Sequence, residues 1–150
     1  MKIVQILGSG VLAVAALCVV GSVQAQMTPV GLWKTIDDKD GAVRSEMRLV
    51  ENAGVVTGVI EKILIPSAEP NCDKCADDRK GKPKLGLEII RGATKAEGKD
   101  VWEGGHIVDP DNGTVYKLRM TPVEGGKKLE VRGFIGFALL GRTQTWIRVQ

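Results

Sequence analysis

Apolar and polar residues alternate with a period of two in several separate stretches of this chain. Between residues 43 and 49, Met47 and Leu49 share one face with Val43, while charged residues occupy the other. The same alternation recurs over 116–120 and 129–135. A period of two with one polar face is typical of a β-strand that is buried on one side only. After Ala25, no stretch has the spacing of an amphipathic helix, so the sequence predicts an all-β fold.

Turn-forming residues separate these stretches. Asp-Gly, Asn-Gly and Gly-Gly pairs recur, and glycine accepts the positive φ that tight hairpin turns require. The connectors delimit eight short stretches rich in Val, Ile, Leu, Thr and aromatic residues. Eight consecutive strands predict an antiparallel up-and-down β-barrel, because closure pairs every strand edge. A two-sheet β-sandwich is the alternative. A barrel of this strand number is filled by side chains or holds one small ligand.

The first twenty-five residues have the three-part pattern of a secretory signal peptide. Lys2 supplies the positive start, an apolar stretch follows, and Val23 and Ala25 are the small residues that signal peptidase requires. The alternatives are an uncleaved membrane anchor and a lipid anchor on Cys18. We expect cleavage after Ala25, residues 26–150 as one β-barrel domain, a periplasmic or secreted location, and no membrane span in the mature chain.

The composition limits the classes of function. The chain is 43% hydrophobic and 26% charged, which excludes a disordered chain and a multi-span membrane protein. Its formal net charge is +3, and removal of the leader lowers this to about +2. Nucleic-acid binding proteins concentrate far more positive charge, so we expect no nucleic-acid partner.

Cys72 and Cys75 are the two cysteines that remain after cleavage, and they form a Cys-x-x-Cys motif. A structural disulfide in an oxidising compartment is the favoured interpretation. A redox motif normally begins a helix beside a βαβ unit, which is missing from the pattern here. A zinc site needs four ligands, and the only histidine is the distant His106. The long segment 66–84 around the motif is itself a candidate for ligand binding or gating, because unstructured loops of this length are uncommon.

Catalytic sites are not indicated. Any nucleophilic arrangement would depend on His106, which is expected to be an ordinary strand residue. Residues 109–113 contain paired acids, but their spacing does not match a calcium-binding loop, so they predict a hairpin turn. We therefore expect a protein that is not an enzyme and needs no metal or cofactor.

The last strand places Arg142, Gln144, Trp146 and Arg148 on one face. If that face points inward, the cavity has an aromatic wall and cations able to hold a carboxylate or phosphate. If it points outward, it is a solvated face, and the sequence leaves the two orientations open. The apolar segment 134–141 is expected to form a lid or part of the core, with an exposed patch for a membrane or partner as the alternative.

Gly31 and Trp33 at the start of the first strand resemble the Gly-x-Trp opening of lipocalins and related calycin barrels. This resemblance implies that a basic residue of the last strand, here Arg148, packs across the tryptophan at the barrel floor. The guanidinium group suits this position, because it stacks on an indole while its donors reach loop carbonyls.

Most of the chain after residue 25 also resembles the secreted bacterial family called domain of unknown function 2147. The residues that carry the resemblance include glycines, aromatic residues and a turn motif in a fixed order: Gly31, Trp33, Gly41, Gly58, Cys72, Cys75, Gly86, Trp102, Gly105, Asp109, Pro110, Gly113, Tyr116, Gly133 and the segment 141–148. The resemblance implies a signal peptide and a small calycin-like barrel, and it implies no activity.

These observations lead to one principal hypothesis and two alternatives. The principal hypothesis is an exported barrel that binds a small amphiphilic or lipid-like ligand. Its candidate ligand-binding residues are Trp33, Tyr116, Arg142, Gln144, Trp146 and Arg148. The alternatives are an envelope protein-interaction module, which would use the Cys72–Cys75 loop and segment 134–141, and a thiol–disulfide protein.

Overall fold

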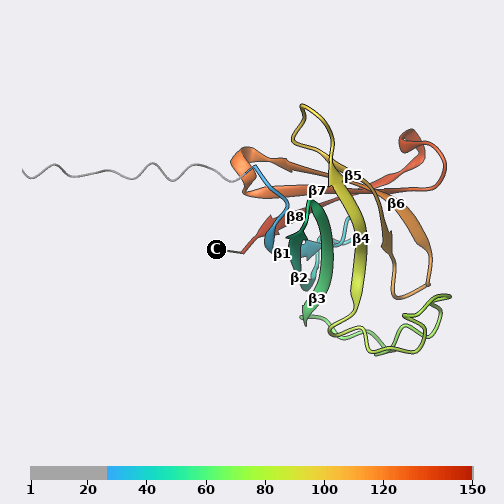
Figure 1. Ribbon diagram of the computed structural model, residues 1–150. Coiled ribbons are helices and arrows are strands. Elements are labelled where there is room, and N and C mark those ends of the chain that lie inside the picture. Colours follow the sequence, from blue (N-terminus) through green and yellow to red (C-terminus); the bar gives the residue numbers. More distant parts are fainter. Residues whose placement is uncertain (1–26, 150) are drawn as a thin grey trace, which may run out of the picture.

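A computed structural model describes residues 27–149, and within them the chain forms one closed antiparallel β-barrel (Figure 1). The predicted signal peptide, residues 1–25, lies outside the described residues. The strands are β1 (Gly31–Ile36), β2 (Val43–Asn52), β3 (Val55–Ile63), β4 (Glu88–Lys95), β5 (Trp102–Val108), β6 (Val115–Val123), β7 (Lys128–Phe134) and β8 (Arg142–Arg148). Two short 3-10 turns, η1 (Glu124–Gly126) and η2 (Ala138–Leu140), lie in connections between strands.

Each strand pairs with the next one in the sequence, and β8 closes the ring against β1. The closing register aligns Trp33 with Arg148 and Lys34 with Ile147. The predicted up-and-down barrel of eight strands is therefore confirmed, and the alternative of a two-sheet sandwich is wrong. Closure leaves no unpaired strand edge to associate with another chain.

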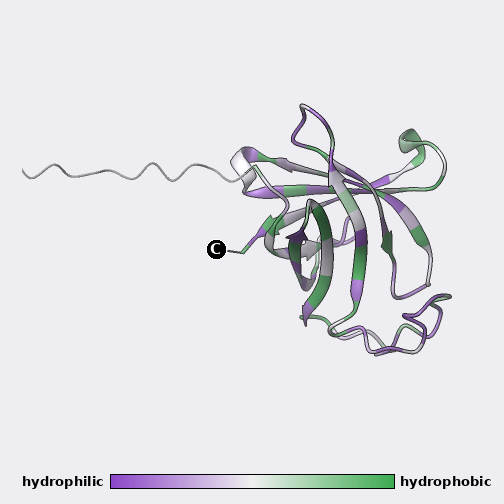
Figure 2. Ribbon diagram, in the orientation of Figure 1, coloured by the Kyte–Doolittle hydropathy of each residue, from purple (hydrophilic) through white to green (hydrophobic). Residues whose placement is uncertain are grey.

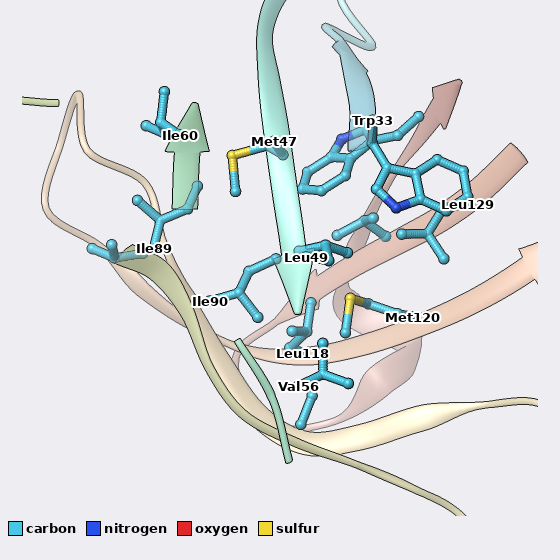
Figure 3. Close-up of a cluster of buried hydrophobic side chains, with 14 of the residues drawn as sticks. Trp33, Met47, Leu49, Val56, Ile60, Ile89, Ile90, Leu118, Met120 and Leu129 are labelled. Carbon is cyan, nitrogen blue, oxygen red and sulfur yellow. The ribbon is translucent and has the colours of Figure 1, made fainter. Parts of the chain in front are cut away.

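The barrel interior is packed with the apolar residues that the two-residue alternation points inward. Met47 and Leu49 of β2 are fully buried, as are Leu118 and Met120 of β6. Figure 3 shows these side chains meeting Trp33 and Leu129 in one cluster. Along the strands, hydrophobic and hydrophilic residues alternate in Figure 2. The alternation that predicted strands therefore also selected the residues of the core.

The antiparallel order gives the barrel two different ends. The connections 37–42, 64–87, 109–114 and 135–141 lie together at one end, called here the open end. The connections 53–54, 96–101 and 124–127 lie at the other end, called the closed end, together with the start of β1 and the end of β8.

The closed end is held by Trp33 and Arg148. The Arg148 guanidinium lies over the Trp33 ring, 4.1 Å from its centroid. Its nitrogen atoms donate hydrogen bonds to the carbonyl oxygens of Gly126 (2.6 Å), Val30 (2.8 Å) and Thr28 (2.7 Å). Gly31 permits this arrangement, since a Cβ there would lie 2.5 Å from an Arg148 nitrogen, and its φ of 138° disfavours other residues. The arginine thus joins the first and last strands and the β6–β7 connection.

Candidate ligand-binding cavity

A cavity of about 840 Å³ opens at the open end of the barrel. Its deeper wall is apolar and comes from several strands: Met47, Ile60, Ile89, Ile107, Val131 and Trp146. Its rim is polar and is built mainly by the open-end connections: Asp37, Lys39, Arg44, Ser67, Lys84, Asp109, Asp111 and Arg142. An apolar pocket of this size below a polar rim has the dimensions and chemistry of a small-molecule site.

The inward face of β8 supplies one wall of this cavity. Trp146, Gln144 and Arg142 all line it, so this face of the strand points inward. Trp146 is the deepest of the three and is only 2% exposed. Its Nε1 donates a hydrogen bond to Gln144 Oε1 at 3.1 Å. The sequence had left the direction open, because alternation defines two faces without saying which one is inside.

Arg142 at the rim is held in an ion pair with Asp38. Its Nε lies 2.7 and 2.6 Å from the two carboxylate oxygens of Asp38, and a second guanidinium nitrogen also contacts that carboxylate. The hydrogen bond from Arg142 is the main reason why the pKa of Asp38 is lowered, and the same bond raises the pKa of Arg142. Gln144 Nε2 lies 3.5 Å from Asp38. The predicted cation is therefore present at the cavity, but its charge is already compensated within the chain.

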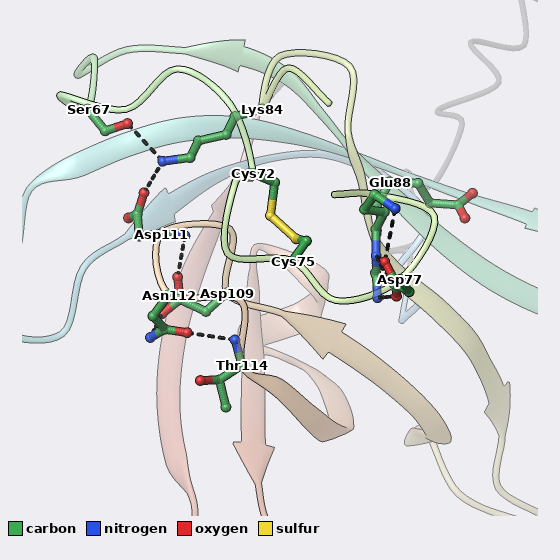
Figure 4. The surroundings of a disulfide bond; sticks show 11 residues. Ser67, Cys72, Cys75, Asp77, Lys84, Glu88, Asp109, Asp111, Asn112 and Thr114 are labelled. Carbon is green, nitrogen blue, oxygen red and sulfur yellow. Dashed lines mark hydrogen bonds and ion pairs between the residues drawn. A yellow bond between two sulfur atoms is a disulfide. The ribbon is translucent and has the colours of Figure 1, made fainter. Parts of the chain in front are cut away.

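Two further rim cations are paired in the same way. Arg44 contacts Asp40 at 2.5 Å and Asp37 at 3.4 Å. The Lys84 ammonium is buried and contacts Asp111 at 2.5 Å and the Ser67 hydroxyl at 3.0 Å (Figure 4). The Lys84–Asp111 pair joins the 64–87 and 109–114 connections, whereas Arg44 of β2 pairs within its own hairpin.

Uncharged polar groups occupy the wall between the rim and the apolar interior. Thr35 Oγ1 and Ser45 Oγ share a hydrogen bond of 2.9 Å. Tyr116 of β6 also lines the cavity, and Gly133 lies beside it in the adjacent strand β7, where a Cβ would lie 3.3 Å from the Tyr116 Cβ. Gly133 thus leaves room for the tyrosine ring.

Of the six candidate ligand-binding residues, four line the cavity and two do not. Tyr116, Arg142, Gln144 and Trp146 belong to its wall. Trp33 and Arg148 are instead engaged with each other at the closed end and do not line the cavity. The alternation on β8 predicted a shared face correctly, but a strand crosses the whole barrel, so residues on one face can serve opposite ends.

The sequence reasoning missed several residues of the cavity. Asp38 lies in a connection rich in turn-forming residues, and it forms the ion pair with Arg142. Met47 was placed on a buried face, Ile60 and Ile89 were not singled out, and nothing in the local sequence distinguishes a core residue from a cavity residue. The position of Asp38 two residues after the end of β1 is the available signal for a rim residue.

The segment between β3 and β4 is a folded lobe at the open end. Cys72 and Cys75 form a disulfide bond within it, with Cα atoms 5.4 Å apart, and both are buried. The Cys72 amide donates to Lys82 O (2.8 Å), and the Gly81 amide donates to Cys72 O (2.9 Å). Arg79 is also buried, where its guanidinium binds Asp77 and reaches Glu88 O at 3.3 Å. The lobe is therefore ordered by its own backbone hydrogen bonds and by buried cations.

The lobe is docked onto the turn between β5 and β6. In that turn Asp109 accepts hydrogen bonds from the Asp111 amide and the Asn112 side chain, both at 2.9 Å (Figure 4). Gly113 has a φ of 76°, and a Cβ there would lie 2.0 Å from Lys74 O. The predicted hairpin turn is thus also the surface on which the cysteine lobe rests.

The two cysteines are joined to each other and are buried. Cys72 is 0% and Cys75 is 2% exposed, whereas exchange requires a thiolate to reach a sulfur atom. Within residues 27–149, no group of three or more His, Cys, Asp or Glu side chains is arranged to hold a metal ion. His106 lies exposed on the outside of β5, opposite Arg91 and Lys117 in the neighbouring strands.

The apolar segment 134–141 is exposed at the rim, so the expectation that it is buried in the core or as a lid is wrong. Phe137 is 79%, Leu139 is 91% and Leu140 is 79% exposed. In Figure 1 the connection between β7 and β8 projects from the body of the barrel. Its two ends remain at the cavity, which Ile135 and Leu140 help to line. The Arg132 guanidinium fixes the segment by donating to Ala138 O at 2.7 Å.

The closed barrel, its Trp–Arg closure and its cavity at one end define a lipocalin-like β-barrel. One solved structure with this architecture is described as "Protein HP1028 from the human pathogen Helicobacter pylori belongs to the lipocalin family". The two chains are 17% identical, with a TM-score of 0.68, and the match covers 81% of this chain and 82% of the other. At this identity the likeness shows a shared fold.

The sequence itself matches a family over residues 31–148, which is nearly the whole barrel. That family is described as "Uncharacterized protein conserved in bacteria (DUF2147)", and this chain belongs to it. The predicted resemblance to this family is therefore confirmed. Comparison with curated proteins gave no match. Within the described residues, no helix has the length and apolar character needed to cross a membrane.

Proposed function

We propose that this protein binds one small amphiphile in the cavity at the open end of its barrel. The cavity itself is the observation that carries this proposal: about 840 Å³ of space with an apolar wall below a polar rim. Pockets of roughly 300–1,000 Å³ hold ligands of drug or lipid size. The likeness to a lipocalin-family structure supports the proposal through the fold only.

Fluorescence of Trp146 provides the direct test. Titration of the protein with a single-chain lipid should change the emission, because the ring forms part of the cavity wall. The change should disappear in Trp146→Phe and persist in Trp102→Phe, whose indole is buried but does not line the cavity. The absence of any spectral change, together with the absence of a co-purified lipid by native mass spectrometry, would contradict the proposal.

Export to the periplasm or the medium forms part of the same proposal. It rests on the leader pattern of residues 1–25, on the buried disulfide and on membership of a bacterial family. Protein isolated from the periplasm of a bacterial host should begin at Gln26 when its intact mass is measured. A mass that includes residues 1–25 would contradict cleavage after Ala25.

A second candidate function is attachment of the open end to a lipid bilayer. The exposed side chains of Phe137, Leu139 and Leu140 favour it, because an apolar projection of this size is unusual on a monomer. The projection adjoins the cavity rim, so an apolar chain could move between bilayer and cavity with little contact with water.

Flotation with phospholipid vesicles tests this second candidate. The wild-type protein should float with the vesicles, and a double variant with Phe137→Asp and Leu139→Asp should remain at the bottom with an unchanged circular dichroism spectrum. Val115→Asp, at an exposed apolar residue at the start of β6, is the control that should still float. Equal flotation of the wild-type protein and the double variant would overturn the bilayer attachment. Crosslinking of Phe137 to a protein, without flotation, would instead indicate a protein partner.

A further inference from the structure

The charged groups around the cavity balance one another. The lining contains four cationic side chains, those of Lys39, Arg44, Lys84 and Arg142. It contains three carboxylates, those of Asp37, Asp109 and Asp111, and Asp38 adds a fourth through its ion pair with Arg142. Asp40, the partner of Arg44, is a fifth carboxylate, so the negative charges are at least as many as the positive ones and leave no net attraction for an anionic headgroup.

Three of the four cations are also paired locally, and the fourth, Lys39, is exposed on the 37–42 connection. Arg142 is bound to both carboxylate oxygens of Asp38, Arg44 to Asp40, and Lys84 to Asp111. An incoming carboxylate could take Arg142 only by displacing Asp38, which would lose its counter-ion at the cavity rim. The Arg142 and Asp38 side chains are 47% and 30% exposed, so an incoming carboxylate would only replace a partner that already satisfies the guanidinium, and it would gain no new charge compensation.

Below this neutralised rim, the polar groups that face the cavity are uncharged. Tyr116 lines the cavity, and its side chain makes no hydrogen bond to another group within residues 27–149. The Gln144 amide binds Trp146 through its oxygen and keeps only a long 3.5 Å contact through its nitrogen. The Thr35 and Ser45 hydroxyls complete this layer. Hydroxyl and amide groups can both donate and accept hydrogen bonds, as a neutral headgroup requires.

We infer that the cavity selects a single-chain amphiphile whose head is uncharged, such as an amide, alcohol or glycerol ester, over the corresponding carboxylate or phosphate. This inference rests on the proposed function, since it names the class of ligand for that same cavity. The apolar chain would lie against Met47, Ile60 and Ile89, and the head would lie at the layer of Tyr116 and Gln144.

Three ligands share the same acyl chain and differ only in their headgroup: palmitamide, monopalmitoylglycerol and palmitate. Comparing them isolates the effect of the headgroup on binding. Displacement of an environment-sensitive fluorescent probe at neutral pH gives the dissociation constants. Palmitamide and monopalmitoylglycerol should each bind about ten-fold more tightly than palmitate. Equal or tighter binding of palmitate would overturn the inference while leaving the proposed function intact. Binding of none of the three would overturn both.

Asp38→Asn tests the physical cause. Without the carboxylate, Arg142 has lost its main counter-ion, so the preference for palmitamide over palmitate should fall by about ten-fold. Asp73→Asn is the matched control, since Asp73 is exposed on the cysteine lobe and does not line the cavity. An unchanged preference in Asp38→Asn would contradict the role of the ion pair.

A measurement on the wild-type protein keeps the test independent of the folding of any variant. Lowering the pH until the fatty-acid carboxyl is protonated makes its head neutral, while the hydrogen bond from Arg142 lowers the pKa of Asp38 and so favours the ionised form of the rim pair. Palmitic acid should then bind as tightly as palmitamide. If palmitic acid still bound more weakly than palmitamide at that pH, the shape of the headgroup and not its charge would determine the affinity. That result would overturn the inference.

Discussion

Single residues at the two ends of the barrel determine which end closes and which end opens. At the closed end, Arg148 stacks on Trp33 and binds three carbonyl groups from segments that are distant in the sequence. Burial lowers the pKa of this arginine, which remains charged because an arginine pKa lies far above neutrality. At the open end, Arg142 of the same strand faces a cavity and is paired with one carboxylate. One strand thus carries the same residue type in a structural and in a rim position.

Replacement of Arg148 should therefore affect folding. Arg148→Lys preserves the charge but loses the planar group that stacks and donates in several directions, so the free energy of unfolding should fall by about 2–4 kcal/mol. Urea denaturation measures this change. Arg119→Lys is the control, because its exposed ion pair with Glu103 should contribute less than about 1 kcal/mol. A loss below 1 kcal/mol for Arg148→Lys would contradict the structural role.

At the scale of elements, the cysteine lobe and the β5–β6 turn act as one unit beside the cavity. Lys84 of the lobe binds Asp111 of the turn, and the lobe backbone at Lys74 lies directly against Gly113. The lobe is long for a connection, yet its buried disulfide and its internal hydrogen bonds give it a fixed shape. It therefore supports one side of the cavity rim.

Gly113→Ala tests the docking of the lobe. Two effects add there: the positive φ disfavours alanine, and the new Cβ would collide with Lys74 O. We expect a loss of about 2–4 kcal/mol in the free energy of unfolding. Gly98→Ala has a comparable φ of 66° but no atom within 4 Å, so it should cost only about 1 kcal/mol. Equal losses in the two variants would show that the contact with Lys74 is unimportant.

Removal of the disulfide should loosen the lobe and preserve the barrel. The cysteines are separated by three positions, and a loop this short gives an entropic stabilisation of roughly 2 kcal/mol. The double variant with Cys72→Ala and Cys75→Ala should lose about that amount in urea denaturation. Hydrogen exchange should become faster at Gly81, which bonds to Cys72, and stay slow at β6. If hydrogen exchange became fast in the strands as well, the disulfide would stabilise the whole barrel, which would contradict a role confined to the lobe.

The whole molecule is sensitive to acid, because many surface carboxylates are paired with arginines. The Arg79 side chain lowers the pKa of Asp77, Arg91 lowers that of Asp78, and Arg142 lowers that of Asp38. A carboxyl whose folded pKa is below its unfolded value stabilises the fold above the unfolded pKa of about 3.9. This stabilisation is lost as the pH falls through the lowered folded pKa.

The denaturation midpoint should thus be nearly constant between pH values of about 5 and 8 and should fall steeply below about 4. Asp78→Asn should make the acid limb shallower, since it removes one of these carboxyls. Asp100→Asn, at a carboxyl on the closed-end hairpin with a single exposed ion pair to Lys95, is the control. A midpoint that rises on acidification would contradict the role of the arginine–carboxylate pairs.

Local sequence predicted the features that depend on backbone geometry, which are the ends of the strands and the face of each strand that is buried. Glycine turns marked the ends of strands, and the period of two assigned Met47, Leu49, Leu118 and Met120 to one buried face. The candidate site was only partly predictable. Tyr116, Gln144 and Trp146 line the cavity as expected, but Trp33 and Arg148 close the other end, and the exposure of Leu139 contradicts a buried segment 134–141.

The sequence by itself determined that the chain is a series of antiparallel strands, because alternation and turn residues act between near neighbours. It favoured a closed ring but left a two-sheet sandwich as the alternative, and the pairing of β8 with β1 decided between them. Only the tertiary structure decided what each inward residue does. Whether Met47 contacts other side chains or empty space depends on the opposite wall, and whether Arg142 is available to a ligand depends on Asp38, over a hundred positions away. Cavities and charge compensation arise from distant parts of the chain that meet only when the barrel closes.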